Sequence, residues 1–136
     1  GALSANSRHT LDSFVSPRRR AAAHVVYSPV DLSAFDPARY DRDRERRALG
    51  LEPAAAAVAL VAQITPWKGQ AEAIEALACV RREVPTAVLL LVGEAKFVAA
   101  STRFDNRSYL AALHDLVRAR RLSGAVRFLG EREDVA

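Results

Sequence analysis

The chain has 136 residues, of which 50% are hydrophobic and 26% are charged; this composition is typical of a folded protein with a core and excludes a disordered chain. The formal net charge of +4 comes partly from arginine runs at 16–20 and 118–121. These runs would suit an anionic partner, although a solvated surface explains each of them more simply. The only cysteine, Cys79, cannot form an internal disulfide, and no apolar stretch is long enough to span a bilayer, so we expect a cytoplasmic protein.

The first 54 residues contain few regular elements. Capping residues before Leu11, Phe14 and Val15 predict a short helix, and residues 23–31 predict a short strand followed by a Ser-Pro turn. Arginine and aspartate are then interleaved up to Gly50, as in a connector with one charged helix. The chain does not begin with Met, and its last residues look like the entrance to another element, so we expect a fragment of a longer protein.

Strands and helices alternate from residue 55 onward. The pattern predicts strands near 57–64, 86–93 and 125–130, with helices near 69–83 and 107–121 between them. Each strand is apolar on both faces, which is typical of a parallel sheet that is covered on both sides. The predicted fold class is therefore α/β, a Rossmann-like parallel sheet with helices on both faces, and we expect it to be incomplete.

The helix faces predict which residues enter the core. We expect the first helix to bury one set and the second helix another: Ile74, Leu77, Ala78 and Val84, then Leu110, Leu113, Leu116 and Val117. Asp105 or Asn106 can cap the second helix. We interpret His114 and Asp115 as a surface pair. Trp67 is expected to cover the sheet edge, with stacking on a ligand as the alternative.

A lysine follows the first strong strand, in the stretch ITPWKGQ at 64–70. Ligands of such sheets bind at the carboxyl ends of the strands, where a helix that begins near Gly69 would present its free N–H groups to an anion. The Lys68 ammonium would add to this attraction, and Gly69 would let a phosphate approach the backbone. The pattern predicts a phosphate site, with an exposed lysine in a tight turn as the alternative. The sequence lacks GxxxxGK[ST] and GxGxxG, which excludes the common P-loop and dinucleotide motifs.

Several stretches together resemble the group 1 family of retaining glycosyltransferases, which have the GT-B fold. They are ANS, VVYSPVDLSAFDP, VAQITPWKGQAEAIEAL, TAVLLLVGE and AVRFLGEREDV, in the order and spacing of the family. The resemblance covers nearly the whole chain. It implies that residues 1–22 end an acceptor domain, that 23–54 form an interdomain connector, and that 55–136 begin the domain that binds the nucleotide-sugar donor.

The resemblance also assigns roles to individual residues. Lys68 and Gly69 match residues that hold the donor diphosphate, and Gln63 stands where the family has an arginine, which removes a charge from this site. The residues that match the loops around the nucleobase and the donor are Gly93, Glu94, Phe128, Gly130, Glu131 and Arg132. In the family, the nucleobase is bound mainly by the backbone of the segment that matches residues 128–132.

The activity implied by the resemblance is transfer of a hexosyl group from a nucleoside-diphosphate sugar to a hydroxyl of a sugar or small-molecule acceptor, with retention. No cofactor is implied, and no residue in the sequence requires a metal. The family's paired glutamates, spaced E-x7-E, would follow Ala136, so we expect no catalytic residue in this chain and no transfer by the chain alone. Peripheral membrane contact of the full enzyme is compatible with the family, and we expect the fragment to self-associate.

Two other classes of function remain open from the residues themselves. A different α/β nucleotide-binding enzyme, such as an epimerase or methyltransferase relative, would need a glycine-rich first loop, which the sequence lacks. A basic nucleic-acid-binding module would need basic residues interleaved with aromatic ones. The stretch RDRERR mixes charges of both signs, so we expect no nucleic-acid partner.

Overall fold

The computed structural model describes residues 3–14, 23–96 and 103–135 of the chain. The chain forms two compact units, Gly1–Pro37 and Ala38–Ala136, called unit 1 and unit 2 below. This boundary lies inside the expected connector, residues 23–54. The strand at the start of that connector belongs to unit 1, and the charged helix near its end belongs to unit 2.

Unit 1 contains two short strands and one helix. The strands β1 (Leu3–Ala5) and β2 (Ala23–Val25) pair in parallel, with Leu3 opposite Ala23. Helix α1 (Arg8–Phe14) contacts both strands, and its Leu11 is only 7% exposed. The predicted short helix is therefore confirmed; Val15 and the side chain of Phe14 lie outside the described residues.

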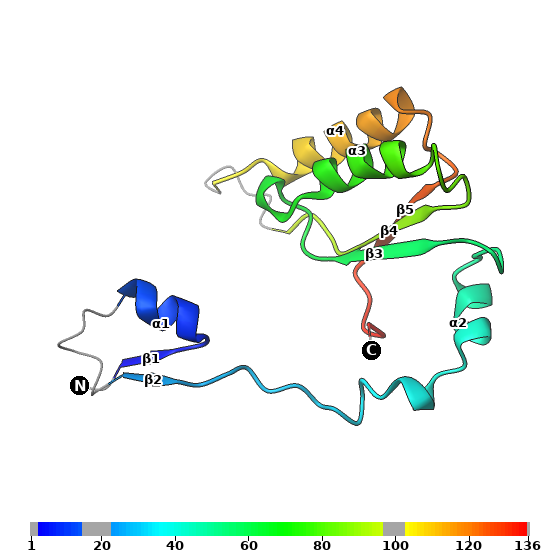
Figure 1. The fold of residues 1–136 in the computed structure, drawn as a ribbon. Helices are drawn as coiled ribbons and strands as arrows, with labels where there is room; N and C mark the ends of the chain where they lie inside the picture. The colour runs from blue at the N-terminus through cyan, green and yellow to red at the C-terminus, as the bar shows by residue number, and fades with distance from the viewer. Residues whose placement is uncertain (1–2, 15–22, 97–102, 136) are drawn as a thin grey trace. The chain divides into compact units, whose positions relative to one another are not determined.

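Unit 2 is organised around a parallel three-stranded sheet (Figure 1). Its strands β3 (Ala57–Val61), β4 (Val88–Val92) and β5 (Val126–Gly130) follow the chain order, with β4 in the centre. All three predicted strands are present. Because β3, β4 and β5 pair in parallel, their three carboxyl ends lie at the same edge of the sheet.

The central strand β4 is buried along its whole length. Leu89 and Leu91 join the main core, whereas Val88 and Leu90 pack with Leu51 on the opposite face. This burial on both faces explains why β4 is an unbroken apolar run. The predicted burial on both faces is therefore confirmed for β4.

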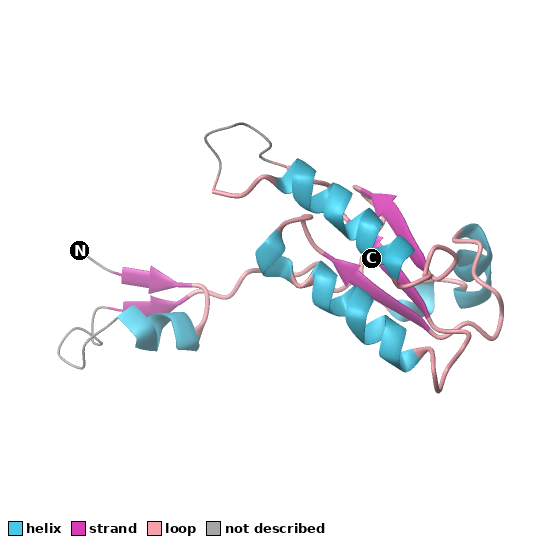
Figure 2. Ribbon diagram, turned by 90° about the horizontal axis from the view of Figure 1, so that it is seen from above, coloured by secondary structure: helices cyan, strands magenta, loops and turns pink. Residues whose placement is uncertain are grey.

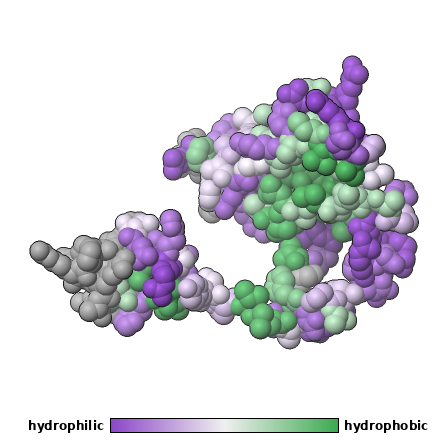
Figure 3. Space-filling model, in the orientation of Figure 1, coloured by the Kyte–Doolittle hydropathy of each residue, from purple (hydrophilic) through white to green (hydrophobic). Residues whose placement is uncertain are grey.

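Strand β3 differs from the predicted pattern because it pairs with β4 along one side and, in the described residues, with no other strand. Val58 and Val61 are 58% and 59% exposed. Only Leu60 of this strand packs against the main core. The expected burial of β3 on both faces is therefore wrong for the described structure, and Figure 3 shows apolar surface in the part of unit 2 where Figure 1 draws β3.

Helices α3 (Gln70–Val80) and α4 (Asn106–Ala119) lie side by side on one face of the sheet (Figures 1 and 2). Ile74 and Leu113 are 0% and 1% exposed, in agreement with the predicted apolar stripes. The Arg120 guanidinium joins the two helices through two hydrogen bonds of 2.8 Å to the Glu75 carboxylate. Val84 follows the end of α3 and is exposed, so its predicted place in the core is wrong.

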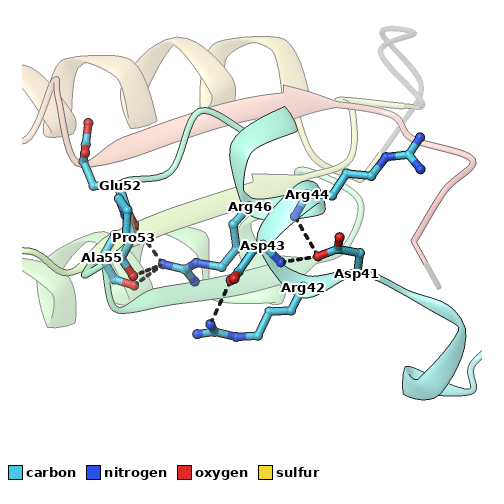
Figure 4. Close-up of polar contacts among 8 residues, drawn as sticks. All are labelled: Asp41, Arg42, Asp43, Arg44, Arg46, Glu52, Pro53 and Ala55. Carbon is cyan, nitrogen blue, oxygen red and sulfur yellow. Dashed lines mark hydrogen bonds and ion pairs between the residues drawn. The ribbon is translucent and has the colours of Figure 1, made fainter.

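The other face of β4 is covered by the segment that follows helix α2 (Arg42–Ala48). The 3-10 turn η2 (Pro37–Arg39) precedes α2, and the Asp41 carboxylate caps this helix by accepting hydrogen bonds from two backbone N–H groups (Figure 4). At the other end, the Arg127 guanidinium on β5 donates to the carbonyls of Leu49 and Gly50. A cation at a helix C-terminus is favourable for the helix dipole, and here it fastens α2 to the sheet.

The loop after α2 is held by a second arginine. The Arg46 guanidinium donates to the carbonyl oxygens of Glu52 and Ala55 at 3.0 Å and 2.6 Å (Figure 4). These contacts place Leu51 and Ala55 against the sheet, where both are buried.

None of the helices in the described residues combines the length and the apolar character that a membrane crossing requires.

Candidate functional site

The connection between β3 and α3 brings Lys68 to the carboxyl end of the sheet. It contains one 3-10 turn, η3 (Pro66–Lys68), which begins after the buried Thr65 and ends at Gly69. Gly69 has a φ of 78°, a left-handed conformation that glycine adopts without steric cost. Lys68 therefore lies where the sequence predicts it, directly before the N-terminus of α3 and not within that helix.

The N-terminus of α3 keeps N–H groups that its own N-cap residue does not bind. Gly69 is the N-cap and makes no side-chain hydrogen bond to the helix. The hydroxyl of Tyr109, on α4, accepts a hydrogen bond of 3.2 Å from the N–H of Ala71. Partial burial raises the pKa of Tyr109, so this hydroxyl stays neutral at physiological pH. The first turn of α3 is thus positioned by α4, with its dipole directed toward the carboxyl edge.

The Lys68 ammonium lies 3.9 Å from the centre of the Trp67 ring. Trp67 is 65% exposed, so it does not cover the edge of the sheet, and that expectation is wrong. All three residues of the 3-10 turn are exposed, and the indole of Trp67 contacts the Lys68 ammonium instead of the sheet.

Gln63 is engaged within the protein. Its side-chain amide donates a hydrogen bond of 3.3 Å to the carbonyl oxygen of Lys96, in the loop after β4. The backbone carbonyl of Gln63 accepts a hydrogen bond of 2.8 Å from the side-chain amide of Gln70, a residue that is fully buried. Gln63 therefore joins the ends of β3 and β4 and the start of α3.

A cavity of about 480 Å³ opens at the carboxyl ends of the strands. Four of the residues expected around the nucleobase line it: Gly93, Glu94, Phe128 and Gly130. The others are Ile64, Ala95, Arg107, Leu110 and His114. We call it the edge pocket. Lys68, Gly69 and Gln63 are not among its lining residues, so the two groups of expected site residues lie at the same sheet edge without forming one cavity.

The side chains of Glu131 and Arg132 do not line the edge pocket. Glu131 forms an ion pair with Lys96, whose pKa is raised by this contact, and Arg132 forms an ion pair with Asp134. The charges of Glu131 and Arg132 are therefore each balanced by a neighbouring side chain. Within this segment, the residues that line the pocket are Phe128 and Gly130 at the end of β5.

Helix α4 contributes three pocket residues that the sequence analysis did not assign: Arg107, Leu110 and His114. His114 and Asp115 are both exposed, so their expected surface position is confirmed. The His114 ring also lies 4.1 Å from the ring of Phe128, and Asp115 forms its ion pair with Arg118. Spacings of three and four residues place the three side chains on one helical face, and this periodicity was the available signal. The sequence did not show that this helical face contacts β5, because that contact depends on the tertiary packing.

The groups at this edge are of the kinds that suit anions and aromatic rings. Lys68 and the first turn of α3 can attract a phosphate, and the edge pocket combines apolar walls with the Arg107 guanidinium and the His114 ring. In the part of the chain that the structure describes, no cluster of three or more His, Cys, Asp and Glu side chains is arranged as a metal site.

The family model described as "Glycosyl transferases group 1" matches residues 41–136. D-inositol 3-phosphate glycosyltransferase of Jonesia denitrificans is 38% identical over an alignment of 93 residues, and the match covers 63% of this chain and 21% of that protein. The enzyme of the same name from Segniliparus rotundus is 44% identical over 71 residues, 52% of this chain and 15% of that protein.

A crystal structure of Anabaena Alr3699/HepE in complex with UDP has a TM-score of 0.81 and 28% identity, covering 98% of this chain and 34% of that one. Crystal structures of the same protein with UDP and glucose and with UDP-glucose give TM-scores of 0.79 and 0.78. The chain thus spans about one third of the length of that solved protein and a smaller share of its curated relatives. From the extent of the family match and the agreement in fold, the chain belongs to the group 1 glycosyltransferases and is part of a GT-B structure.

Proposed function

We propose that the chain supplies nucleotide-binding contacts to a glycosyltransferase that uses a nucleoside-diphosphate sugar. The observation that carries the proposal is the position of Lys68, directly before a helix N-terminus that its N-cap leaves open, at the sheet edge that also forms the edge pocket. Lys68, Gly69 and the first turn of α3 would hold the diphosphate. This location follows the general rule that parallel sheets bind ligands at their carboxyl edge.

The edge pocket is assigned to the nucleobase. Phe128 and His114 offer ring surfaces, and Gly93 and Gly130 let a ligand approach the backbone. Because the side chains of Glu131 and Arg132 are occupied in ion pairs, their contribution would come from the backbone. Gln63 would act indirectly, since its side-chain amide already binds the loop after β4.

The reaction proposed for the full enzyme is transfer of a hexosyl group to an acceptor hydroxyl of a sugar or small molecule, with retention. Negative charge builds on the leaving diphosphate in the transition state. Lys68 and the α3 amides would stabilise this charge, because the fold has positioned them before the reaction. From the same resemblance we also propose that the enzyme is cytoplasmic, that it uses no cofactor, and that residues 1–136 alone transfer no sugar.

The test is a titration of the chain with UDP, the ligand bound by the Anabaena protein. Replacement of Lys68 by alanine is expected to weaken UDP binding about five-fold or more, because one cation next to a phosphate is lost, and to leave uridine binding unchanged. Isothermal titration calorimetry measures both affinities. The same preparations, incubated with UDP-glucose and candidate acceptors, are expected to form no glycoside.

The matched control is Arg82→Ala. Arg82 carries the same charge and is exposed, but it follows the opposite end of α3. Removing it should change UDP affinity by less than about two-fold, because charges separated by more than about 10 Å in solvent are screened by salt. Equal losses for the two variants, or no binding of UDP by the unaltered chain, would contradict the proposed diphosphate site.

A further inference from the structure

The indole of Trp67 forms a platform beneath the Lys68 ammonium. The ammonium nitrogen lies 3.9 Å from the ring centre, within the range of a favourable cation–π contact. Trp67 is 65% exposed, so core packing does not explain its position. The Lys68 side chain is itself exposed, and its ammonium contacts the face of this ring.

The backbone beneath the pair is well anchored. The N–H of Lys68 donates a hydrogen bond of 3.1 Å to the carbonyl of Thr65, which is 1% exposed. Gly69 then turns the chain into α3. The ring and the ammonium are therefore presented from one fixed 3-10 turn, next to the helix N-terminus.

A lysine side chain without a partner samples many rotamers, and ligand binding must select one of them. A ring beneath the ammonium removes part of this freedom before the ligand arrives. An ammonium has three N–H donors, and one ring face does not use all of them. The ring can therefore restrain the lysine and leave it able to bind an anion.

We propose that Trp67 is a positioning residue that holds the Lys68 ammonium ready for the diphosphate. The inference rests on the diphosphate site proposed above and adds a residue that acts through Lys68. The ring stays beneath the ammonium when the ligand binds. Because part of the rotamer freedom of Lys68 is lost before binding, Trp67 raises affinity for a diphosphate by about two- to five-fold and does nothing for a ligand without phosphate.

A double-mutant cycle tests this with UDP as the probe. We expect Trp67→Leu to weaken UDP binding about two- to five-fold, Trp67→Phe to weaken it less, and uridine binding to be unchanged in both. In a Lys68→Ala background, Trp67→Leu should have no further effect, because the residue through which it acts is gone. The same loss in both backgrounds, or unchanged or tighter UDP binding in Trp67→Leu, would overturn the proposal.

A spectroscopic readout tests the contact without a ligand. Trp67 is the only tryptophan of the chain, so tryptophan emission reports on its surroundings alone. Lys68→Ala should change this emission in the free protein, and Lys68→Arg should change it less because a cation remains above the ring. Thermal unfolding of each variant should match the unaltered chain, since both side chains are exposed.

The two proposals fail in different ways. If UDP binds and Lys68→Ala weakens it while Trp67→Leu does not, the diphosphate site stands and the positioning role of Trp67 is wrong. If the unaltered chain does not bind UDP, both proposals are wrong. Emission that is identical in the unaltered chain and in Lys68→Ala would overturn the positioning role whatever the titrations show.

Discussion

Gly93 is the residue at which the end of β4 comes closest to β3. It has a φ of 135°, and a Cβ atom added to it would lie 2.1 Å from the backbone carbonyl oxygen of Ala62. Its N–H donates a hydrogen bond of 2.7 Å to the carbonyl of Gly130 on β5. Gly93 therefore binds the end of β5 and lies close to the backbone after β3, and any side chain there would meet backbone atoms that cannot move aside.

Replacement of Gly93 by alanine is expected to destabilise the chain by about 3 kcal/mol, because both the backbone conformation and the contact with Ala62 become strained. Urea denaturation followed by circular dichroism measures the free energy of unfolding. The matched control is Gly124→Ala, since no heavy atom lies within 4 Å of a Cβ built there. The control should change stability by less than about 0.5 kcal/mol; similar values for the two variants would show that the close approach at Gly93 does not matter.

At the scale of elements, helix α4 connects the edge pocket to the N-terminus of α3. Its first turn is capped by Asp105, whose carboxylate accepts hydrogen bonds of 2.9 Å and 2.6 Å from the N–H and hydroxyl of Ser108. One turn further, the Tyr109 hydroxyl binds the N–H of Ala71. Asn106 donates a hydrogen bond of 2.6 Å to the carbonyl of Lys96, which also accepts from Gln63. The start of α4 thus fixes both the loop after β4 and the first turn of α3.

The cap of α4 predicts how stability depends on pH. The hydrogen bonds from Ser108, with the nearby Arg107, lower the pKa of Asp105 below its usual value. A lowered folded-state pKa means that the ionised carboxylate stabilises the fold above its unfolded pKa of about 3.9, and that this contribution is lost as the pH falls through the folded value. Other carboxylates titrate in the same range, so the contribution of Asp105 must be measured as a difference between two variants.

We expect Asp105→Asn to be less stable than the unaltered chain at pH 7, and the difference to disappear near pH 2. Asparagine is also a good N-cap but carries no charge, so the variant isolates the ionisation of Asp105 from the cap geometry. Urea unfolding at a series of pH values gives the difference in the free energy of unfolding. A difference that is constant from pH 7 to pH 2 would mean that the charge of Asp105 makes no contribution.

At the scale of the whole molecule, unit 2 is a sheet whose strands are protected to different degrees. β4 has a strand on each side and apolar cover on both faces, whereas β3 has a free edge in the described structure. Unpaired strand edges with apolar side chains favour association between chains. Leu11 of helix α1 is buried within unit 1, so this side chain is not available for such association.

The chain is therefore expected to self-associate through β3. Sedimentation velocity over a wide concentration range should show oligomers, and Val58→Lys should shift the distribution toward the monomer, because a charge on an edge strand opposes pairing. Ala112→Lys adds the same charge to an exposed position on α4 and should have no effect. A monomer at all concentrations for the unaltered chain would contradict this expectation.

The elements of unit 2 and the place of Lys68 could be predicted from the sequence because they depend on local patterns. Apolar runs and helical stripes arise from the periods of strands and helices, and the turn at Gly69 follows from the conformational freedom of glycine. The strands were therefore predicted almost at their observed positions, and Asp105 was among the expected caps. The resemblance of several short motifs added the family, which the comparisons show.

Contacts between distant segments were decided only by the tertiary structure. The sequence does not say that β3 has a free edge, that His114 meets Phe128, or that Gln63 binds the carbonyl of Lys96. Each of these depends on which element becomes the neighbour of another, and residues 14 or more positions apart leave no periodic signal of their contact. The sequence by itself determined the elements, their order and the loop that carries Lys68; packing decided which side chains share the edge pocket and which are used to hold the loops together.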